Sequence, residues 1–348
     1  MTAYQFSYTA KQPVPKQVPI PLPGPDEVLV KVLASGVCHT DVTLIHHPEF
    51  VPTLAQAPSF TLGHEAAGII ESVGERAKET YPHLTKGTYV AVHCMNACYE
   101  PTCETCSSGK SNLCHKLPWL GMGANGTWAS HVLARARCVL PVPGDTSSIP
   151  PEVAAIATDA VLTPYHALKT VGELKKGQTV LIVGCGGLGL NAIQVAKNYL
   201  GAGVVVGYDL REEALERAKE SGADYTATPD TFTELFQSKN LAADVIVDFV
   251  GIQATFDKGL EALQVGGKII VIGMTAPQVA LDLYKGMVKG ATVALSTWGT
   301  LTELEEVLQG IADGKLKPKV EKRPLAECGK MVEELRDGKI AFRVAVVP

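Results

Sequence analysis

The stretch Thr179-Val-Leu-Ile-Val-Gly-Cys-Gly-Gly-Leu-Gly189 decides the fold of the second half of the chain. Its first five residues form a short apolar run that is typical of a buried strand, and a helix-like run over residues 190–199 follows the glycines. A lone Gly-x-Gly-x-x-Gly pattern is weak evidence. Between a strand and a helix, however, its glycines let the backbone approach a pyrophosphate at a helix N-terminus. The stretch therefore predicts a dinucleotide-binding turn.

A second predicted strand, residues 203–208, ends at Asp209. A carboxylate at this point can bind the two hydroxyls of the adenosine ribose, and it would repel a 2′-phosphate. We therefore predict NAD rather than NADP, a preference that Arg211 could soften. The alternative is a glycine-rich turn in an α/β domain that binds no cofactor.

Strands continue to alternate with helices after Asp209, which is typical of a parallel sheet. The further strands are expected at residues 244–247, 268–272, 292–295 and 341–347, and the helices at 254–263, 302–311 and 333–337. The second half of the chain is therefore expected to be an α/β domain.

The first half contains short strands separated by glycine and proline, a pattern that favours a small β-barrel-like domain. The predicted strands cover residues 27–33, 67–73, 88–92, 130–133 and 138–140. Pro48, Pro52 and Pro58 mark a long irregular segment, and Pro150-Pro151 marks the expected domain boundary.

A possible metal site lies in Gly36-Val-Cys-His-Thr-Asp41, which follows the strand at 27–33 and is expected to form a loop. Gly63-His64-Glu65 comes later in the chain. A thiolate and an imidazole together suit zinc, so we predict that Cys38 and His64 are two ligands of a catalytic zinc ion. Taken singly, they could also be a buried thiol and a hydrogen-bonded core histidine.

A second cysteine cluster has the spacing Cys103-x2-Cys106-x7-Cys114. A closed structural zinc site requires four ligands. The fourth is either Glu100, which continues the two-residue spacing, or Cys98, which is the softer ligand. Reduced thiols in a metal-free lobe are the alternative, and a nucleic-acid-binding zinc finger fits poorly in an acidic chain.

Composition narrows the remaining possibilities. The 348 residues are more than one hydrophobic core usually holds, so two domains are expected. A net charge of −5 gives no support for nucleic-acid binding, and no apolar run approaches the length of a membrane span. No secretory signal is visible, and nine cysteines, an odd number, suit metal ligation in a reducing compartment. We therefore expect a cytoplasmic protein.

Taken together, the motifs resemble the zinc-containing medium-chain alcohol dehydrogenase family over nearly the whole chain. The resemblance rests on 36–41, 63–65, the Cys103/Cys106/Cys114 spacing, 163–168, the glycine turn with Asp209, and the terminal Phe-Arg343-Val-Ala-Val. It implies a GroES-like catalytic domain, residues 1–151 and 297–348, and a Rossmann domain with a doubly wound parallel sheet, residues 152–296.

The resemblance also implies the roles of several residues at the catalytic metal. The family's third zinc ligand lies just ahead of the 163–168 run, where this chain has Asp159. Cys38, His64 and Asp159 would then hold the catalytic zinc, and Asp41 would brace the far nitrogen of His64. Read alone, Asp159 could instead be the N-cap of a helix. Glu65 would lie behind the metal.

Other roles concern the proton and the cofactor. Thr40 would accept the substrate proton and pass it to the nicotinamide ribose, and Arg343 would meet either Glu65 or the pyrophosphate. The family's proton relay often ends in a histidine where this chain has Thr43, so His46 or His47 could serve instead. The residues implied to bind the cofactor are His39, Gly184, Gly186, Gly187, Leu188, Gly189, Asp209 and Arg343.

For the structural zinc, the resemblance favours Glu100 with Cys103, Cys106 and Cys114. The family usually has a cysteine at the position of Glu100, but some members have glutamate there. Cys98 remains the alternative fourth ligand.

The implied activity is reversible oxidation of alcohols, first of all secondary alcohols, to ketones or aldehydes, with hydride transfer from a zinc-bound alkoxide to NAD. A homodimer or homotetramer with two zinc ions per chain is expected. The alternatives are a zinc-free NADPH reductase of quinones or enones on the same fold, and a non-catalytic dinucleotide-binding protein.

Overall fold

The computed structural model describes residues 1–47 and 59–348. Pro48, Pro52 and Pro58 of the predicted irregular segment lie outside the described residues. The chain divides into two compact units, of which unit 1 contains Met1–Asp159, Thr300–Ala312 and Lys319–Pro348, and unit 2 contains Ala160–Gly299 and Asp313–Pro318. No helix in the described part of the chain has the length and apolar character needed to cross a membrane.

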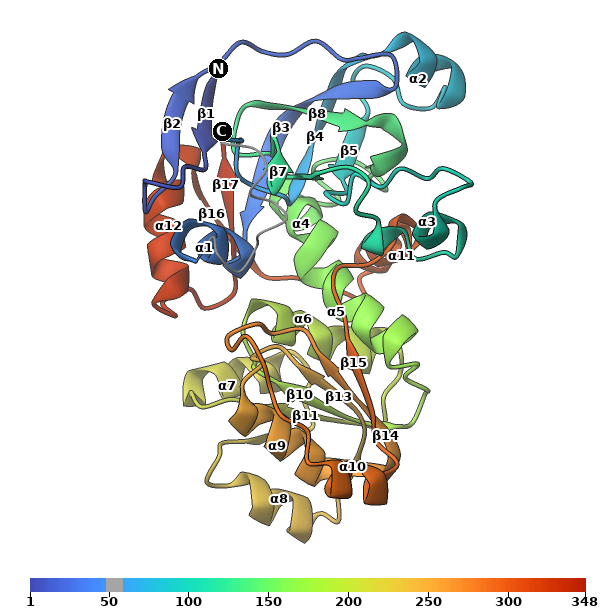
Figure 1. Ribbon diagram of the computed structural model, residues 1–348, viewed down its shortest axis with the longest axis vertical. Coiled ribbons are helices and arrows are strands. Elements are labelled where there is room, and N and C mark those ends of the chain that lie inside the picture. The colour runs from blue at the N-terminus through green and yellow to red at the C-terminus, as the bar shows by residue number, and fades with distance from the viewer. Residues whose placement is uncertain (48–58) are drawn as a thin grey trace. The chain divides into compact units, whose positions relative to one another are not determined.

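Unit 2 is built on a parallel sheet of six strands (Figure 1). The strands are β10 (Thr179–Val183), β11 (Val204–Tyr208), β12 (Tyr225–Ala227), β13 (Ala243–Asp248), β14 (Leu263–Val271) and β15 (Thr292–Leu295). Their order is β12-β11-β10-β13-β14-β15, and every neighbouring pair is parallel. The order reverses between β10 and β13, so the sheet is doubly wound.

Unit 2 also contains helices, of which the first precedes β10 and the others connect successive strands. They are α5 (Leu162–His166), α6 (Gly187–Gln194), α7 (Glu212–Glu220), α8 (Phe232–Ser238), α9 (Gln253–Ala262) and α10 (Leu283–Lys289). Wider π-helical turns, Ala167–Val171 and Val195–Tyr199, extend α5 and α6. The helix predicted at 190–199 is therefore present, but it begins at the glycine turn itself.

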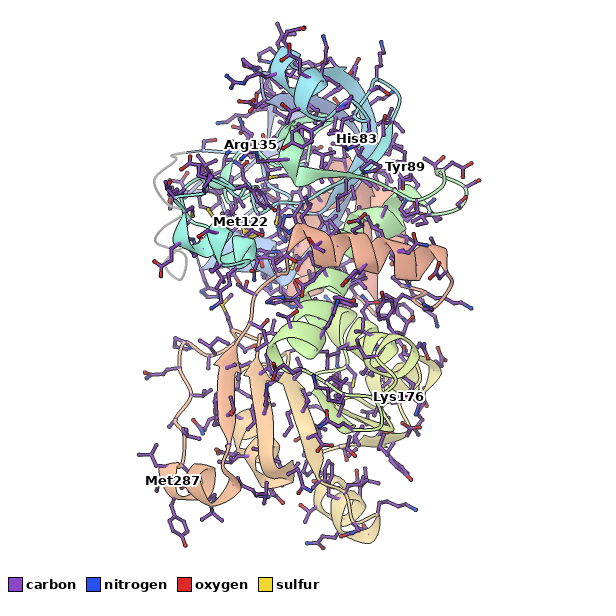
Figure 2. All side chains as sticks on the ribbon, turned by 90° about the vertical axis from the view of Figure 1, so that its right-hand side faces the viewer. His83, Tyr89, Met122, Arg135, Lys176 and Met287 are labelled. Atoms are coloured by element: carbon purple, nitrogen blue, oxygen red, sulfur yellow. The ribbon has the colours of Figure 1, made fainter. Side chains whose placement is uncertain are left out.

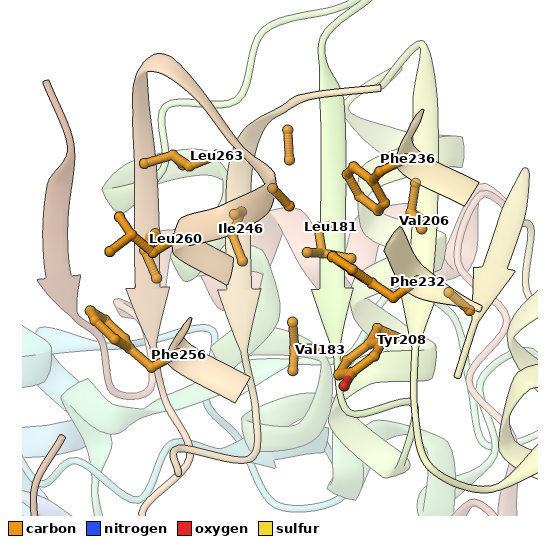
Figure 3. Packing of buried hydrophobic residues seen from close by; sticks show 14 of the residues in the cluster. Leu181, Val183, Val206, Tyr208, Phe232, Phe236, Ile246, Phe256, Leu260 and Leu263 are labelled. Atoms are coloured by element: carbon orange, nitrogen blue, oxygen red, sulfur yellow. The ribbon is translucent and has the colours of Figure 1, made fainter. Parts of the chain in front are cut away.

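One hydrophobic cluster of unit 2 lies between the sheet and helices α8 and α9 (Figure 3). Phe232 of α8 is 1% exposed, stacks on Phe236 with ring centroids 4.5 Å apart, and meets Tyr208 of β11 edge-on at 5.1 Å. Phe256 and Leu260 of α9 belong to the same cluster. In the predicted alternation of strands and helices, the helices that connect the strands thus pack their aromatic side chains against the sheet.

Unit 1 is built on a seven-stranded sheet. Its strands are β3 (Glu27–Val37), β4 (Ala66–Val73), β5 (Tyr89–Val92), β8 (His131–Arg135), β9 (Val139–Pro141), β16 (Val320–Pro324) and β17 (Arg343–Val347). Strand β3 pairs antiparallel with β4, β8 and β17. Two small sheets add β1 (Thr2–Gln5) with β2 (Val14–Gln17), and β6 (Trp119–Leu120) with β7 (Gly123–Ala124).

The helices of unit 1 are α1 (His39–His46), α2 (Glu75–Thr80), α3 (Glu104–Ser107), α4 (Pro151–Ile156), α11 (Leu301–Ala312) and α12 (Cys328–Arg336). The loop predicted after β3 is wrong, because the strand runs on to Val37 and the next residues form α1. Leu44 and Ile45 of α1 are buried, and α1 packs on α12.

We predict that Phe232→Ala will destabilise unit 2, because it removes a fully buried ring from the core. The expected loss is about 3–5 kcal/mol of unfolding free energy. Met287→Ala on α10 is the control, since this side chain is 73% exposed (Figure 2) and its loss should cost under about 0.5 kcal/mol. Urea denaturation followed by circular dichroism measures both, and equal midpoints would contradict the packing described here.

Candidate active site and metal centres

Three neighbouring strands of unit 1 bring the first group of reactive side chains together. Cys38 follows the end of β3, Glu65 precedes β4, and Arg343 begins β17. These strands are paired in register at this edge, and the Gly36 N–H donates to the Glu65 carbonyl at 2.9 Å. Residues far apart in the sequence therefore meet at one end of the sheet.

Asp159 reaches this group from a helix. Helix α4 packs on β3 and β4 and continues into a π-helical turn, Ala157–Val161. Such turns are frequent at functional sites. The Asp159 carboxylate lies 3.3 Å from Cys38 Sγ and 3.5 Å from His64 Nε2. The alternative that Asp159 is a helix N-cap is wrong, because the helix begins eight residues earlier at Pro151.

One ligand atom from each of Cys38, His64, Glu65 and Asp159 lies within 4.8 Å of all the others, and all four residues are buried. Asp41 braces the group. Its carboxylate accepts the Cys38 N–H at 2.9 Å and lies 3.5 Å from His64 Nδ1, the nitrogen that faces away from Asp159. This is the arrangement in which a carboxylate orients a metal-bound imidazole.

The electrostatics of the group fit a divalent cation. Burial raises the pKa of the Cys38 thiol, and the neighbouring Asp159 carboxylate raises it further. Burial also raises the pKa of Glu65 to about 8, although Arg343 contacts it and opposes the shift. Burial disfavours the imidazolium of His64, but Asp41 and Asp159 together hold its pKa well above the usual value. Without a cation these groups would retain protons, which a metal ion replaces.

Close backbone packing leaves room for the Glu65 carboxylate. A Cβ atom on Gly36 would lie 1.7 Å from Glu65 Oε2, so the position requires glycine. On the other side, the Trp128 indole N–H donates to the Gly36 carbonyl at 3.2 Å. Trp128 is completely buried and supports the strand end, a packing role that its sequence position alone could not distinguish from lining a substrate pocket.

The remaining predicted residues near this group lie on α1. Thr40 is partly exposed, and its Oγ1 lies 3.7 Å from Cys38 Sγ, whereas His39 is exposed at the start of the helix. The Thr43 hydroxyl donates to the His39 carbonyl at 3.1 Å. His46 Nε2 lies 3.0 Å from Glu333 of α12, so His46 takes part in the contact between α1 and α12.

Sequence reasoning missed Cys94, which follows β5. It is completely buried, and its pKa is raised by burial and by the negative charges of Asp159 and Glu65, while His64 opposes the shift. Cys94 therefore lies close to the first group. Its distance in sequence from Cys38 and His64 carries no spacing signal that could have indicated this.

The second group contains four cysteines: Cys98, Cys103, Cys106 and Cys114. Cys98 Sγ lies 3.8 Å from Cys106 Sγ, and Cys103 Sγ lies 4.0 Å from Cys114 Sγ. Backbone N–H groups point at two of the sulfurs, from Glu100 to Cys98 and from Cys98 to Cys114, both at 3.5 Å. Four sulfurs at these distances fit a closed tetrahedral zinc site.

The preference for Glu100 as the fourth ligand is not supported, because the structure groups Cys98 with the other three cysteines. The Glu100 carboxylate is exposed and pairs with Lys116 at 2.8 Å. Tyr99, between the two candidates, has a left-handed backbone with φ 49°. The chain therefore turns Cys98 inward and Glu100 outward.

The glycine turn of unit 2 has the geometry that the sequence predicts. Gly184 has φ 87°, and a Cβ atom on Gly189 would lie 1.9 Å from the Gly184 carbonyl oxygen. Helix α6 begins at Gly187, and a Cβ atom on Gly186 would meet open space. Backbone N–H groups at a helix start, with open space beside Gly186, fit the pyrophosphate of a dinucleotide.

Asp209 follows β11 beside this turn. Its carboxylate accepts the Cys185 N–H at 2.8 Å and the Arg211 N–H at 3.0 Å, and the Arg211 guanidinium lies 3.2 Å away. The Asp209 carboxylate is thus held beside the glycine turn, the position from which the sequence predicts it to bind the adenosine ribose of NAD. Arg211 partly neutralises its charge.

Comparison with known proteins matches this chain to zinc-dependent dehydrogenases, in agreement with the two candidate metal groups. The alcohol dehydrogenase GroES-like domain matches residues 24–144, and the zinc-binding dehydrogenase family matches residues 187–313. An alcohol dehydrogenase of Geobacillus stearothermophilus is 33% identical over 335 residues, which cover 95% of each chain. The chain belongs to the zinc-containing medium-chain alcohol dehydrogenase family.

Solved structures support the family fold. An acetophenone reductase from Geotrichum candidum, in complex with NAD, is 33% identical with a TM-score of 0.86, covering 100% of this chain and 97% of that one. The alcohol dehydrogenase of Aeropyrum pernix is 29% identical with a TM-score of 0.90 over 100% of both chains. The predicted GroES-like domain and the Rossmann-like parallel sheet are therefore confirmed, and the chain is an oxidoreductase with two candidate zinc sites.

We predict that Cys98→Ser will lower the zinc content from about two ions per chain to about one, because a structural zinc requires all four ligands. Glu100→Gln is the matched control from two residues away and should retain both ions, since its carboxylate faces Lys116. Zinc content is measured by plasma mass spectrometry after dialysis. Loss of zinc in Glu100→Gln, with retention in Cys98→Ser, would instead identify Glu100 as the fourth ligand.

Proposed function

We propose that this chain is a zinc- and NAD-dependent dehydrogenase that interconverts secondary alcohols and ketones. The proposal rests on one observation above all, the convergence of Cys38, His64 and Asp159 within one buried group. The preference for secondary alcohols is supported by the 33% identity to a protein named for the reduction of acetophenone, a ketone. A homodimer or homotetramer stays a prediction.

The proposed ligands balance the charge of the metal. A Cys38 thiolate and an Asp159 carboxylate together carry the charge that neutralises Zn²⁺, and Arg343 neutralises Glu65 beside them. His64 would bind through Nε2, because its Nδ1 faces Asp41. Bound there, zinc would supply the Lewis acidity that lowers the pKa of an alcohol hydroxyl, and NAD would supply the hydride acceptor.

Thr40 is proposed to relay the proton of the substrate hydroxyl, because its oxygen would accept that proton as its own hydrogen passes to the ribose of NAD. Its side chain is partly exposed and lies next to Cys38, so it can contact a molecule at the metal. A positioned hydroxyl of this kind typically contributes to rate through proton transfer and not through metal binding.

The alternative functions have less support. A zinc-free NADPH reductase has no use for four buried ionisable groups within 4.8 Å of one another. Such a cluster would also be costly to retain in a non-catalytic dinucleotide-binding protein, because buried ionisable groups destabilise a fold unless they are paired or bound to a metal.

The test is a panel of matched secondary and primary alcohols with NAD, followed by NADH absorbance. We expect kcat/KM for secondary alcohols to exceed that for primary alcohols by about tenfold or more. Cys38→Ser should lose one zinc and all turnover. Cys328→Ala is the control, since it removes a buried thiol that belongs to neither metal group.

Two outcomes would contradict the proposal. Full activity in Cys38→Ser would show that Cys38 does not hold a catalytic zinc ion. If the zinc-loaded protein binds NADH but turns over no alcohol or ketone, a non-catalytic function would be favoured.

We predict that Thr40→Val will retain both zinc ions but lower kcat by about 10²–10⁴-fold, because it removes the hydroxyl without changing the shape of the side chain. Thr43→Val is the matched control on the same helix, since the Thr43 hydroxyl already bonds to the His39 carbonyl. Stopped-flow measurement of NADH formation compares the two. Equal rates for both variants would exclude Thr40 as the proton acceptor.

A further inference from the structure

A buried carboxylate in unit 2 is used neither by the metal groups nor by the glycine turn. Asp248 ends β13 directly opposite Val183, the last residue of β10, and is 1% exposed. Its Oδ1 accepts the N–H groups of Val250 and Gly251 at 2.8 and 3.0 Å, and its Oδ2 accepts the Thr255 hydroxyl at 2.8 Å. One side chain thus fixes the turn that follows its own strand.

This turn is held between two other segments, which also follow the carboxyl ends of strands in the sheet. On one side, a Cβ atom on Gly184 would lie 2.8 Å from Val250 Cγ2, so the Val250 side chain packs on the glycine turn. On the other side, the N–H groups of Thr275 and Ala276 donate to the carbonyls of Val250 and Gly251, at 3.2 and 3.1 Å. The Asp248 carboxylate therefore sets the position of a turn that links the segments after β10 and β14.

The backbone leaves little freedom at this point. Gly251 has φ 71°, and a Cβ atom there would lie 1.9 Å from the Gly273 carbonyl oxygen. Without the Asp248 carboxylate, two N–H groups of the turn would lose their acceptor, which is costly where water cannot replace it.

The location of the turn relates it to the cofactor. In doubly wound sheets a dinucleotide lies across the carboxyl ends of the strands, at the point where the strand order reverses. Here the reversal is between β10 and β13. Asp209, after β11, marks the adenosine side, so the other half of the dinucleotide would extend over the ends of β13 and β14. That is where the 250–251 turn and the segment 273–276 lie.

We propose that Asp248 is a positioning residue for the nicotinamide half of the cofactor. It fixes the 250–251 turn, and through that turn the segment after β14, as one wall for that half of the dinucleotide. This inference rests on the proposed use of NAD. It assigns to Asp248 no contact with the cofactor and no part in adenosine binding.

The test compares the affinity of Asp248→Ala for NADH with its affinity for AMP, which represents the adenosine half alone. NADH affinity, measured by fluorescence titration, should fall by about tenfold, the size expected when buried donors lose their acceptor. AMP affinity, measured by calorimetry, should change by less than about threefold. Asp248→Asn should recover most of the NADH affinity, because its amide oxygen can still accept from both N–H groups.

Asp244→Ala is the matched control. Asp244 lies near the start of the same strand, at the amino-terminal ends of the strands and so opposite to Asp248. Its carboxylate accepts the Thr179 N–H of β10 at 2.8 Å. Its loss should lower the melting temperature without changing the affinity for NADH or AMP. If Asp248→Ala does not fold, Asp248→Ser is judged by the same two affinities, since its shorter hydroxyl cannot bond to both N–H groups.

Two results would overturn the inference. Unchanged NADH affinity in the Asp248 variants would show that the turn does not matter for the cofactor. An equal loss of NADH and AMP affinity would show that Asp248 supports unit 2 as a whole. Binding of NADH by the parent protein tests the proposed cofactor itself, so failure there is distinguishable from failure of the role of Asp248.

Discussion

Several ionisable side chains share one buried site in this protein, and their charges must be balanced there without the help of water. Cys38, His64, Glu65 and Asp159 lie within 4.8 Å of one another. Arg343, itself 4% exposed, contacts Glu65. Such a cluster would be strongly destabilising if it held unpaired charge. A divalent cation held there would neutralise the thiolate and Asp159, while the guanidinium of Arg343 neutralises Glu65.

The fold of unit 1 positions the side chains whose charges balance one another. The ends of three hydrogen-bonded strands supply a thiol, a carboxylate and a guanidinium, and their register fixes the spacing between them. Gly36 leaves the room that the Glu65 carboxylate occupies. Asp159 comes from a π-helical turn, whose wider backbone places the side chain where a regular α-helix would direct it differently.

Much of this arrangement was predictable from sequence where a short-range pattern carried the information. Strands β10 and β15 have the predicted bounds, because glycine or polar residues lie within two positions of each end of the apolar run. Helix α1 was missed, because Thr40, Val42 and Thr43 are β-branched and lower its intrinsic propensity. Packing against α12, which is distant in sequence, stabilises this helix. The sequence could not choose between Cys98 and Glu100, because the choice depends on the backbone turn at Tyr99.

The central claim is that the two groups hold zinc through different donor sets, one of four sulfurs and one of sulfur, nitrogen and oxygen. X-ray absorption at the zinc edge measures this directly. If Asp159 supplies the oxygen, Asp159→Ala should alter the nitrogen and oxygen bonds of the mixed site, near 2.0–2.1 Å, and leave the zinc–sulfur bonds of the four-cysteine site, near 2.3 Å, unchanged. A spectrum in which the variant and the parent show the same mixed shell would contradict the account.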